Sequence, residues 1–347
     1  MPGKYRVVLC GTVIQVCLGG IYAWAVFVPS LRQAYGLTTA QTQAIFGTAV
    51  AAWTLAMIPA GLVLPRVGPR AVAALAGALF LGGSGLAALS GGNFWLLWLG
   101  VGGLIGSAIG CGYVCPLTLF AQWFPARPGL ATGLAVGSFG GGAILEAALG
   151  ELLLERGVGV LQSLGWIGVA YGLLIVAGAL GLSSPPGPVS RSAVPALPLR
   201  QLVADRPFQL VVLGIFCGTF AGLLVIGNLK SIGLAGGLDP AVCTVGVSLF
   251  AVGSASGRIV WGWICDWAGS RTIPVSLSLL AGAVLLLYAL SAAGALFVPA
   301  CGLVGFGYGA CFVLYAAYVA RQYGAQRVSS IYPLVFLAFG LSGIVGP

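Results

Sequence analysis

Eleven segments of the chain are apolar over about 20 residues each, and this repeated feature constrains the fold more than any other. They lie at roughly residues 6–28, 41–63, 71–90, 94–121, 129–150, 160–182, 208–229, 241–264, 272–291, 295–319 and 328–347. The hydrocarbon core of a bilayer is about 30 Å thick, and only helices or closed barrels satisfy their backbone polar groups inside it. Barrel strands would alternate polar and apolar residues, whereas these segments are apolar throughout. The sequence therefore predicts an all-α membrane protein.

The composition supports lipid as the surrounding solvent. Hydrophobic residues make up 59% of the chain and charged residues 6%, whereas a soluble domain carries about 25% charged residues. Disorder would require few apolar residues, and the 57 glycines follow no triplet period of the collagen kind. We expect the lipid bilayer to be a partner of this chain.

The basic residues predict how the helices are oriented. If the N-terminus lies in the cytoplasm, 11 of the 15 basic residues fall on that side and three on the other, as the positive-inside rule requires. The cytoplasmic set is Lys4, Arg6, Arg66, Arg70, Arg127, Arg191, Arg200, Arg206, Arg271, Arg321 and Arg327. The first segment lacks a small-residue cleavage site, so we expect a retained helix in the cytoplasmic membrane. The same bias explains the net charge of +9, and nucleic-acid binding is not expected.

Metal, cofactor and enzyme chemistry find little support in the sequence. The chain has nine cysteines, no CxxC pair and no histidine. We therefore expect no metal site, no cofactor and no disulfide. No nucleophile and base occur at a recognisable spacing either, so we expect a protein that is not an enzyme.

A proline-rich segment divides the chain into two halves that share a repeat. Residues 183–207 hold 6 of the 19 prolines, and we expect them to form a cytoplasmic linker between domains at residues 1–182 and 208–347. The sequence GLVLPRVGPR at 61–70 recurs as GWICDWAGSR at 262–271, and both copies follow the second helix of their half. Repeated units of this kind are typical of secondary transporters.

The repeat resembles the GxxxDxxGxR signature of the major facilitator superfamily, which implies two six-helix bundles. Eleven of the twelve helices are then present, so we expect the second bundle to be truncated at its C-terminus; a protein that lacks one helix of the design is the alternative. The second copy is complete, and its acid and arginine could pair near helix ends and hold one face shut. The first copy has Pro65 where the acid belongs. The residues of this conformational-gate motif are Gly61, Arg66, Gly68, Arg70, Gly262, Asp266, Gly269 and Arg271.

Three further motifs give a narrower resemblance that covers nearly the whole chain. They are GIYAW at 20–24, WFPARPGLATG at 123–133 and GRIVWG at 257–262. Together they resemble the oxalate:formate antiporter family and, more distantly, the monocarboxylate transporters.

Arg258 is the main candidate binding residue, because a guanidinium inside a membrane helix costs at least about 2.5 kcal/mol and persists mainly beside a cavity. It precedes Asp266 by eight residues, which places it about 12 Å inside the helix. Glu146 is the only other charge well inside a predicted helix, toward the outer end of its segment. An arginine without an acidic partner would bind a carboxylate, because its planar fork matches the two oxygens. A partner within the protein remains the alternative.

The resemblance implies that Arg258 binds substrate and suggests Tyr22, Tyr113, Tyr308 and Phe312 as walls of the site. Tyr308 and Phe312 are four residues apart and can share one helix face. Asn228 could donate a further hydrogen bond or could cap its helix.

One departure from the family bears on the substrate. Oxalate carriers of this family pair the arginine with a lysine in helix eleven, whereas residues 331–337 here contain no cation. One positive charge would leave a dianion half neutralised, so we favour monocarboxylates such as formate, lactate or pyruvate. We expect a monomeric carrier that exchanges these anions by alternating access. Proton-coupled symport, oxalate/formate antiport, and a channel or non-transporting sensor are the alternatives.

Overall fold

The computed structural model describes residues 2–186, 197–291 and 294–345. All regular structure in these ranges is helical, which confirms the predicted all-α class. The chain divides into two compact units, one of Met1–Trp123 with Ser138–Val194 and the other of Phe124–Gly137 with Pro195–Pro347. The first part of α7 (Pro128–Glu155) therefore belongs to the second unit and the rest of this helix to the first.

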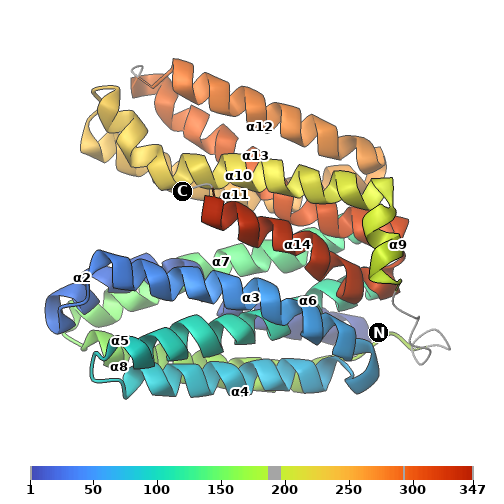
Figure 1. Ribbon diagram of the computed structural model, residues 1–347, viewed down its shortest axis with the longest axis horizontal. Helices are drawn as coiled ribbons and strands as arrows, with labels where there is room; N and C mark the ends of the chain where they lie inside the picture. The colour runs from blue at the N-terminus through green and yellow to red at the C-terminus, as the bar shows by residue number, and fades with distance from the viewer. Residues whose placement is uncertain (1, 187–196, 292–293, 346–347) are drawn as a thin grey trace. The chain divides into compact units, whose positions relative to one another are not determined.

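Six spans build the first unit (Figure 1). They are formed by α1 (Pro2–Gly19), η1 (Gly20–Ala23) and α2 (Trp24–Tyr35), then α3 (Thr39–Val67), α4 (Pro69–Ala88), α5 (Phe94–Leu97) with η2 (Trp98–Ile105) and α6 (Gly106–Trp123), α7 and α8 (Val160–Gly181). Helix α4 packs against α8, and α3 packs against α6. Two of these spans depart from α geometry, because η1 is a 3₁₀ turn and η2 is a π-helix.

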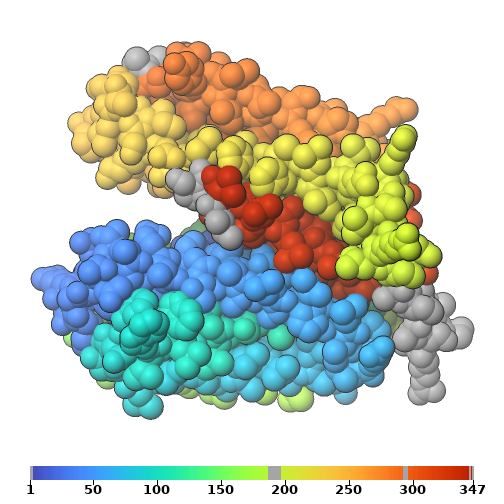
Figure 2. All heavy atoms as spheres, in the orientation of Figure 1, coloured from blue at the N-terminus to red at the C-terminus, as the bar shows by residue number. Residues whose placement is uncertain are grey.

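The second unit contains the first part of α7 and the remaining helices. They are α9 (Leu199–Ala204), α10 (Arg206–Ala235), α11 (Pro240–Ala268), η4 (Gly269–Arg271), α12 (Thr272–Ala289), α13 (Gly294–Gln322), η5 (Ala325–Arg327) and α14 (Val328–Val345). Helix α14 packs along α10, and their side chains form a continuous surface in the space-filling view (Figure 2). Helices α11 and α13 form the most extensive helix pair of this unit.

The helices occur where the apolar segments predicted them. Within the described residues, nine stretches are long and apolar enough to cross a membrane, one of which combines α11 and α12. Helix α10 begins at Arg206, earlier than expected, with Asp205 at its N-cap and a proline in its first turn. The predicted boundaries at residues 1–182, 183–207 and 208–347 stay a prediction, and residues 187–196, which include Arg191, lie outside the described residues.

Glycines allow α11 and α13 to approach closely at the level of Arg258. A Cβ atom on Gly257 would overlap the Phe306 carbonyl, and one on Gly309 would overlap the Ser254 carbonyl. Lipid provides no hydrophobic driving force between helices, so membrane helices associate largely through van der Waals packing. Small residues strengthen this packing because they let the helix backbones approach closely. This pairing fixes the part of α11 that carries Arg258.

Candidate functional site

Arg258 lies inside α11 and is 5% exposed. Ten residues separate it from the end of the helix at Ala268, a distance of about 15 Å along the axis. Its Nη1 donates a hydrogen bond to the Val136 carbonyl of α7 at 3.1 Å, and its guanidinium lies 4.8 Å from the centre of the Phe312 ring. Among the described residues no carboxylate pairs with Arg258, and its Nε has no hydrogen-bond partner.

These contacts hold the guanidinium without neutralising it. A carbonyl oxygen and the face of an aromatic ring each attract a cation, but neither carries a formal negative charge. Gly133 allows α7 and α11 to come close enough for the hydrogen bond between Arg258 and the Val136 carbonyl. A Cβ atom on Gly133 would come within 2.7 Å of the backbone carbonyl oxygen of Arg258. The side chain therefore keeps both its charge and a free donor.

The ring against Arg258 comes from α13 and packs against other rings of α13 and α14. Phe312 and Tyr308 form an edge-to-face pair with ring centres 5.0 Å apart, so the predicted shared face exists. Phe339 of α14 lies 5.4 Å from Phe312, and Phe336 stacks on Phe339 at 4.9 Å. The sequence did not predict that Phe336 and Phe339 would pack against Phe312, although Phe336 lies in the stretch 331–337 that contains no cation.

Tyr22 and Tyr113 belong to the first unit, where both contact the rings of Trp53 and Phe139. Tyr113 is 1% exposed and lies 5.4 Å from Trp53 and 5.2 Å from Phe139, measured between ring centres. Tyr22 contacts the same rings at 6.4 and 5.8 Å. The two tyrosines are thus members of one aromatic cluster, which we call the Tyr22 cluster, and Trp53 and Phe139 are members that the sequence did not reveal.

Asn228 has a local contact. Its Nδ2 donates to the Leu224 carbonyl of the same helix at 2.9 Å, and the side chain is exposed. The helix continues to Ala235, so the suggestion that Asn228 caps its end is wrong. The apolar residues after Lys230 allow the helix to extend.

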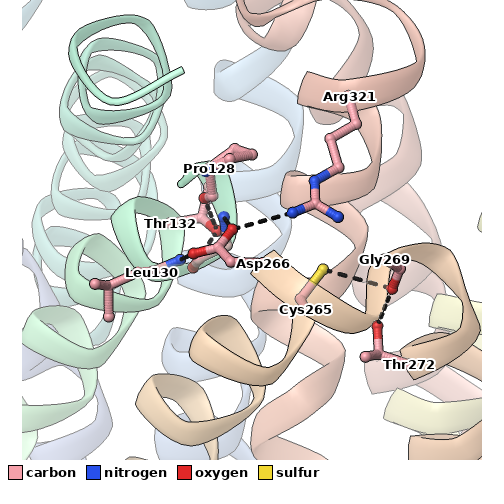
Figure 3. A network of polar contacts seen from close by, with 9 residues as sticks. Pro128, Leu130, Thr132, Cys265, Asp266, Gly269, Thr272 and Arg321 are labelled. Atoms are coloured by element: carbon pink, nitrogen blue, oxygen red, sulfur yellow. Dashed lines mark hydrogen bonds and ion pairs between the residues drawn. The ribbon is translucent and has the colours of Figure 1, made fainter. Parts of the chain in front are cut away.

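Asp266 joins three helices near the end of α11 (Figure 3). Its two carboxylate oxygens accept hydrogen bonds from the backbone N–H groups of Gly129 at 2.7 Å and Leu130 at 2.8 Å, in the first turn of α7. Arg321, in the last turn of α13, forms an ion pair with the same carboxylate at 3.2 Å. Free N–H groups and the helix dipole both favour an anion at a helix N-terminus.

Asp266 pairs with Arg321 in this structure and not with Arg271, the partner that the motif suggested. Arg271 is exposed and follows the turn, whereas Arg321 reaches the carboxylate from the end of a neighbouring helix. A Cβ atom on Gly129 would overlap the Gly262 carbonyl, so these two glycines let α7 and α11 come close enough for the Asp266 hydrogen bonds. Gly262 therefore contributes to the close packing of α7 against α11.

The two turns of the repeat share an unusual backbone conformation. Gly68 has φ 85° and ψ 160°, and Gly269 has φ 67° and ψ −147°, in a region that only glycine adopts readily. In the first copy Arg70 donates from Nε to the Leu182 carbonyl at 2.8 Å, just after α8. Gly61 is buried, and Arg66 and Pro65 are exposed.

A further polar contact lies outside the membrane-spanning helices. The Tyr323 hydroxyl donates to the carboxylate of Asp205, the residue that precedes α10. Burial, with the hydrogen bond and charge of Asp205, raises the pKa of Tyr323 well above its ordinary value. This tyrosine therefore stays protonated at neutral pH and donates to Asp205.

Known proteins resemble the chain over nearly its whole length. A family model described as Major Facilitator Superfamily matches residues 9–347. An uncharacterized MFS-type transporter, YhjX, of Escherichia coli K12 is 29% identical over 99% of this chain and 88% of its own. The oxalate:formate antiporter of Oxalobacter formigenes is 24% identical over 92% and 81%. The apicoplast pyruvate carrier 1 of Toxoplasma gondii is 27% identical over 40% of this chain and 32% of its own.

Solved structures show the same fold. The crystal structure of the transporter FucP in its outward conformation matches with a TM-score of 0.67 and 16% identity, over 99% of both chains. The proton:xylose symporter XylE matches with a TM-score of 0.60 and 14% identity, over 99% of this chain and 94% of its own. With the family model covering nearly all residues, the chain belongs to the Major Facilitator Superfamily and is a multi-pass membrane transporter.

Proposed function

We propose that this transporter moves small monocarboxylate anions, such as formate, lactate or pyruvate, and binds them at Arg258. The observation that carries the proposal is the guanidinium itself, which is buried in a membrane helix and has no carboxylate partner among the described residues. An intramembrane arginine of this kind requires an anion or a polar cavity, because lipid cannot solvate it. Its planar donors match the oxygens of a carboxylate.

The surroundings of Arg258 favour an anion with one charge. Phe312 lies against the guanidinium, and the buried rings of Phe336 and Phe339 pack against Phe312. No second cation occurs in residues 331–337. A dianion would keep one uncompensated charge in this aromatic environment, whereas a monocarboxylate and Arg258 neutralise each other. Two relatives named for oxalate, formate and pyruvate also support a small carboxylate.

The positive charge of Arg258 also favours the exchange of one anion for another. If the carrier changed conformation while empty, it would occlude an uncompensated guanidinium, whereas a bound carboxylate removes that cost. The carrier would therefore move one anion inward for each anion that it moves outward. Tyr22, Tyr113, Tyr308 and Phe312 are the proposed walls of the site. Asn228 is left out because it bonds to its own helix.

The experiment is uptake of labelled formate, lactate and oxalate into proteoliposomes preloaded with unlabelled acid. We expect uptake of a monocarboxylate that requires the internal acid and is lost in Arg258→Gln. Lys230→Gln removes an exposed positive charge from the same unit and should leave uptake unchanged. Preference for oxalate would overturn the monocarboxylate assignment, and equal uptake by Arg258→Gln would overturn the site.

We further propose that the N-terminus faces the cytoplasm, in the cytoplasmic membrane, and that the carrier acts as a monomer. The distribution of basic residues supports this orientation. A single cysteine introduced beside Arg66 in a cysteine-free variant should react with an impermeant reagent only after the cells are broken. Reaction in intact cells would reverse the orientation.

A further inference from the structure

A small cavity inside the first unit lies where two spans depart from α geometry. Its volume is about 40 Å³, and its lining includes Gly20 of η1, Val101 of η2, Ser84 of α4 and Glu146 of α7. A water molecule needs about 10–15 Å³ of such space, so the cavity has room for about three. π-Helical turns often occur at functional sites, because they displace side chains from the regular helical positions.

Glu146 places a carboxyl group in the membrane interior. It lies about 7 Å along the helix axis from the middle of α7, which spans Pro128–Glu155. The carboxyl group fits against the backbone of η1, and a Cβ atom on Gly20 would overlap it. The glycine therefore provides the space that the carboxyl group occupies.

Among the described residues of this unit, no cation pairs with Glu146. The side chains around the cavity are apolar apart from Ser84, and none of the lining residues is basic. Among the described residues, the titratable groups that interact with Glu146 are Cys17 of α1 and Tyr171 of α8. Thiols and phenols are ordinarily neutral at physiological pH. The cavity-lining residues from α2, α4 and η2 include no titratable group. An ionised carboxylate here would lack both a counter-ion and bulk water.

The cavity also contains a free hydroxyl group. Ser84 is 2% exposed, and its Oγ has no hydrogen-bond partner among the described residues. A buried hydroxyl group without a protein partner is costly unless water satisfies it. Ser84, water and Glu146 could thus form a short path along which a proton reaches the carboxyl group.

We propose that Glu146 binds a proton in this cavity and that the carrier changes conformation only when this proton is bound. The proton passes from water in the cavity to a carboxylate oxygen of Glu146 and returns to water on release. The inference rests on the proposed carboxylate transport. With carboxylate on Arg258 and a proton on Glu146, neither unit has an uncompensated charge inside the membrane, so the proton accompanies the carboxylate in both directions of exchange.

The transport test is a pH profile of exchange, with equal pH inside and outside. We expect wild-type exchange to fall about tenfold for each pH unit above the apparent pKa of one titrating group. Glu146→Gln is permanently neutral and should keep its exchange rate over the same range. Glu151→Gln removes an exposed carboxylate from the same helix and should behave like wild type. Vesicles with Arg258→Gln correct for passive entry of undissociated acid.

A wild-type pH profile in Glu146→Gln would overturn the inference and leave the Arg258 site standing. A direct measurement separates the two proposals. Infrared titration of the purified protein should show the carbonyl band of a protonated carboxylic acid, lost as pH rises and absent in Glu146→Gln. Absence of that band in wild type would overturn the inference, even if none of the acids tested were transported.

Discussion

The two copies of the repeated turn share a glycine in an unusual backbone conformation but have different side-chain contacts. Gly68 and Gly269 occupy matching positions and the same glycine-only conformation. At the position three residues before each glycine, however, the second copy has Asp266, with two hydrogen bonds and an ion pair, whereas the first has exposed Pro65. The glycine conformation at this turn therefore does not depend on the acid.

The two units also differ in the charged side chain that each places inside the membrane. The second unit holds Arg258 against a carbonyl and an aromatic ring, and the first holds Glu146 beside a cavity. The two units thus carry opposite charges inside the membrane, on helices that do not correspond in the repeat. Under our proposals the second unit binds the anion and the first binds the proton.

The largest effect is expected for Arg258→Lys, which tests whether anion binding needs the planar guanidinium or only a positive charge. Arg258→Lys keeps the positive charge but replaces a planar fork with a point charge, which cannot hold the Val136 carbonyl and a carboxylate in the same way. We expect uptake to fall at least about tenfold, because loss of one charge-assisted hydrogen bond costs about 1.5–3 kcal/mol. Labelled uptake at subsaturating substrate measures it. Wild-type uptake by the lysine variant would mean that charge alone suffices.

The next effect tests the contrast between Asp266 and Pro65. Asp266→Ala should lower the free energy of unfolding in detergent by about 3 kcal/mol, because two backbone donors and Arg321 lose their acceptor. Pro65→Ala, at the matching position, removes no polar contact and should cost nothing. Equal losses in the two variants would show that the copies are more alike than their contacts indicate.

The shared backbone conformation predicts a matched pair of glycine variants. Gly68→Ala and Gly269→Ala should each lower the free energy of unfolding by about 2 kcal/mol, because alanine is strained in this region of φ and ψ. Denaturant titration of both variants measures the costs. A cost confined to Gly269 would break the equivalence of the two turns.

The smallest effect concerns the ion pair alone. The Arg321 side chain is 31% exposed, so Arg321→Gln should cost less than about 1 kcal/mol, in the range of exposed salt bridges. Arg271→Gln provides the control, since Arg271 is exposed beside the same turn. A larger loss in Arg271→Gln than in Arg321→Gln would restore the pairing that the sequence suggested.

Much of the fold could be predicted because lipid imposes a simple rule on composition. Each apolar segment had to be a helix to satisfy its backbone, so the positions of the helices followed from the sequence. The 3₁₀ turn at Gly20–Ala23 and the π-helix at Trp98–Ile105 could not be predicted in this way. Apolar runs have no feature that separates one helical hydrogen-bond pattern from another.

The sequence by itself determined that the chain lies in lipid, where its helices are, that one turn recurs, and that Arg258 lies inside a span. Only the tertiary structure decided that Arg258 meets the Val136 carbonyl and Phe312, and that Asp266 pairs with Arg321 rather than Arg271. The reason is physical: solvent and local conformation are properties of neighbouring residues, whereas a hydrogen bond or ion pair forms only when residues distant in the chain come within about 3–4 Å.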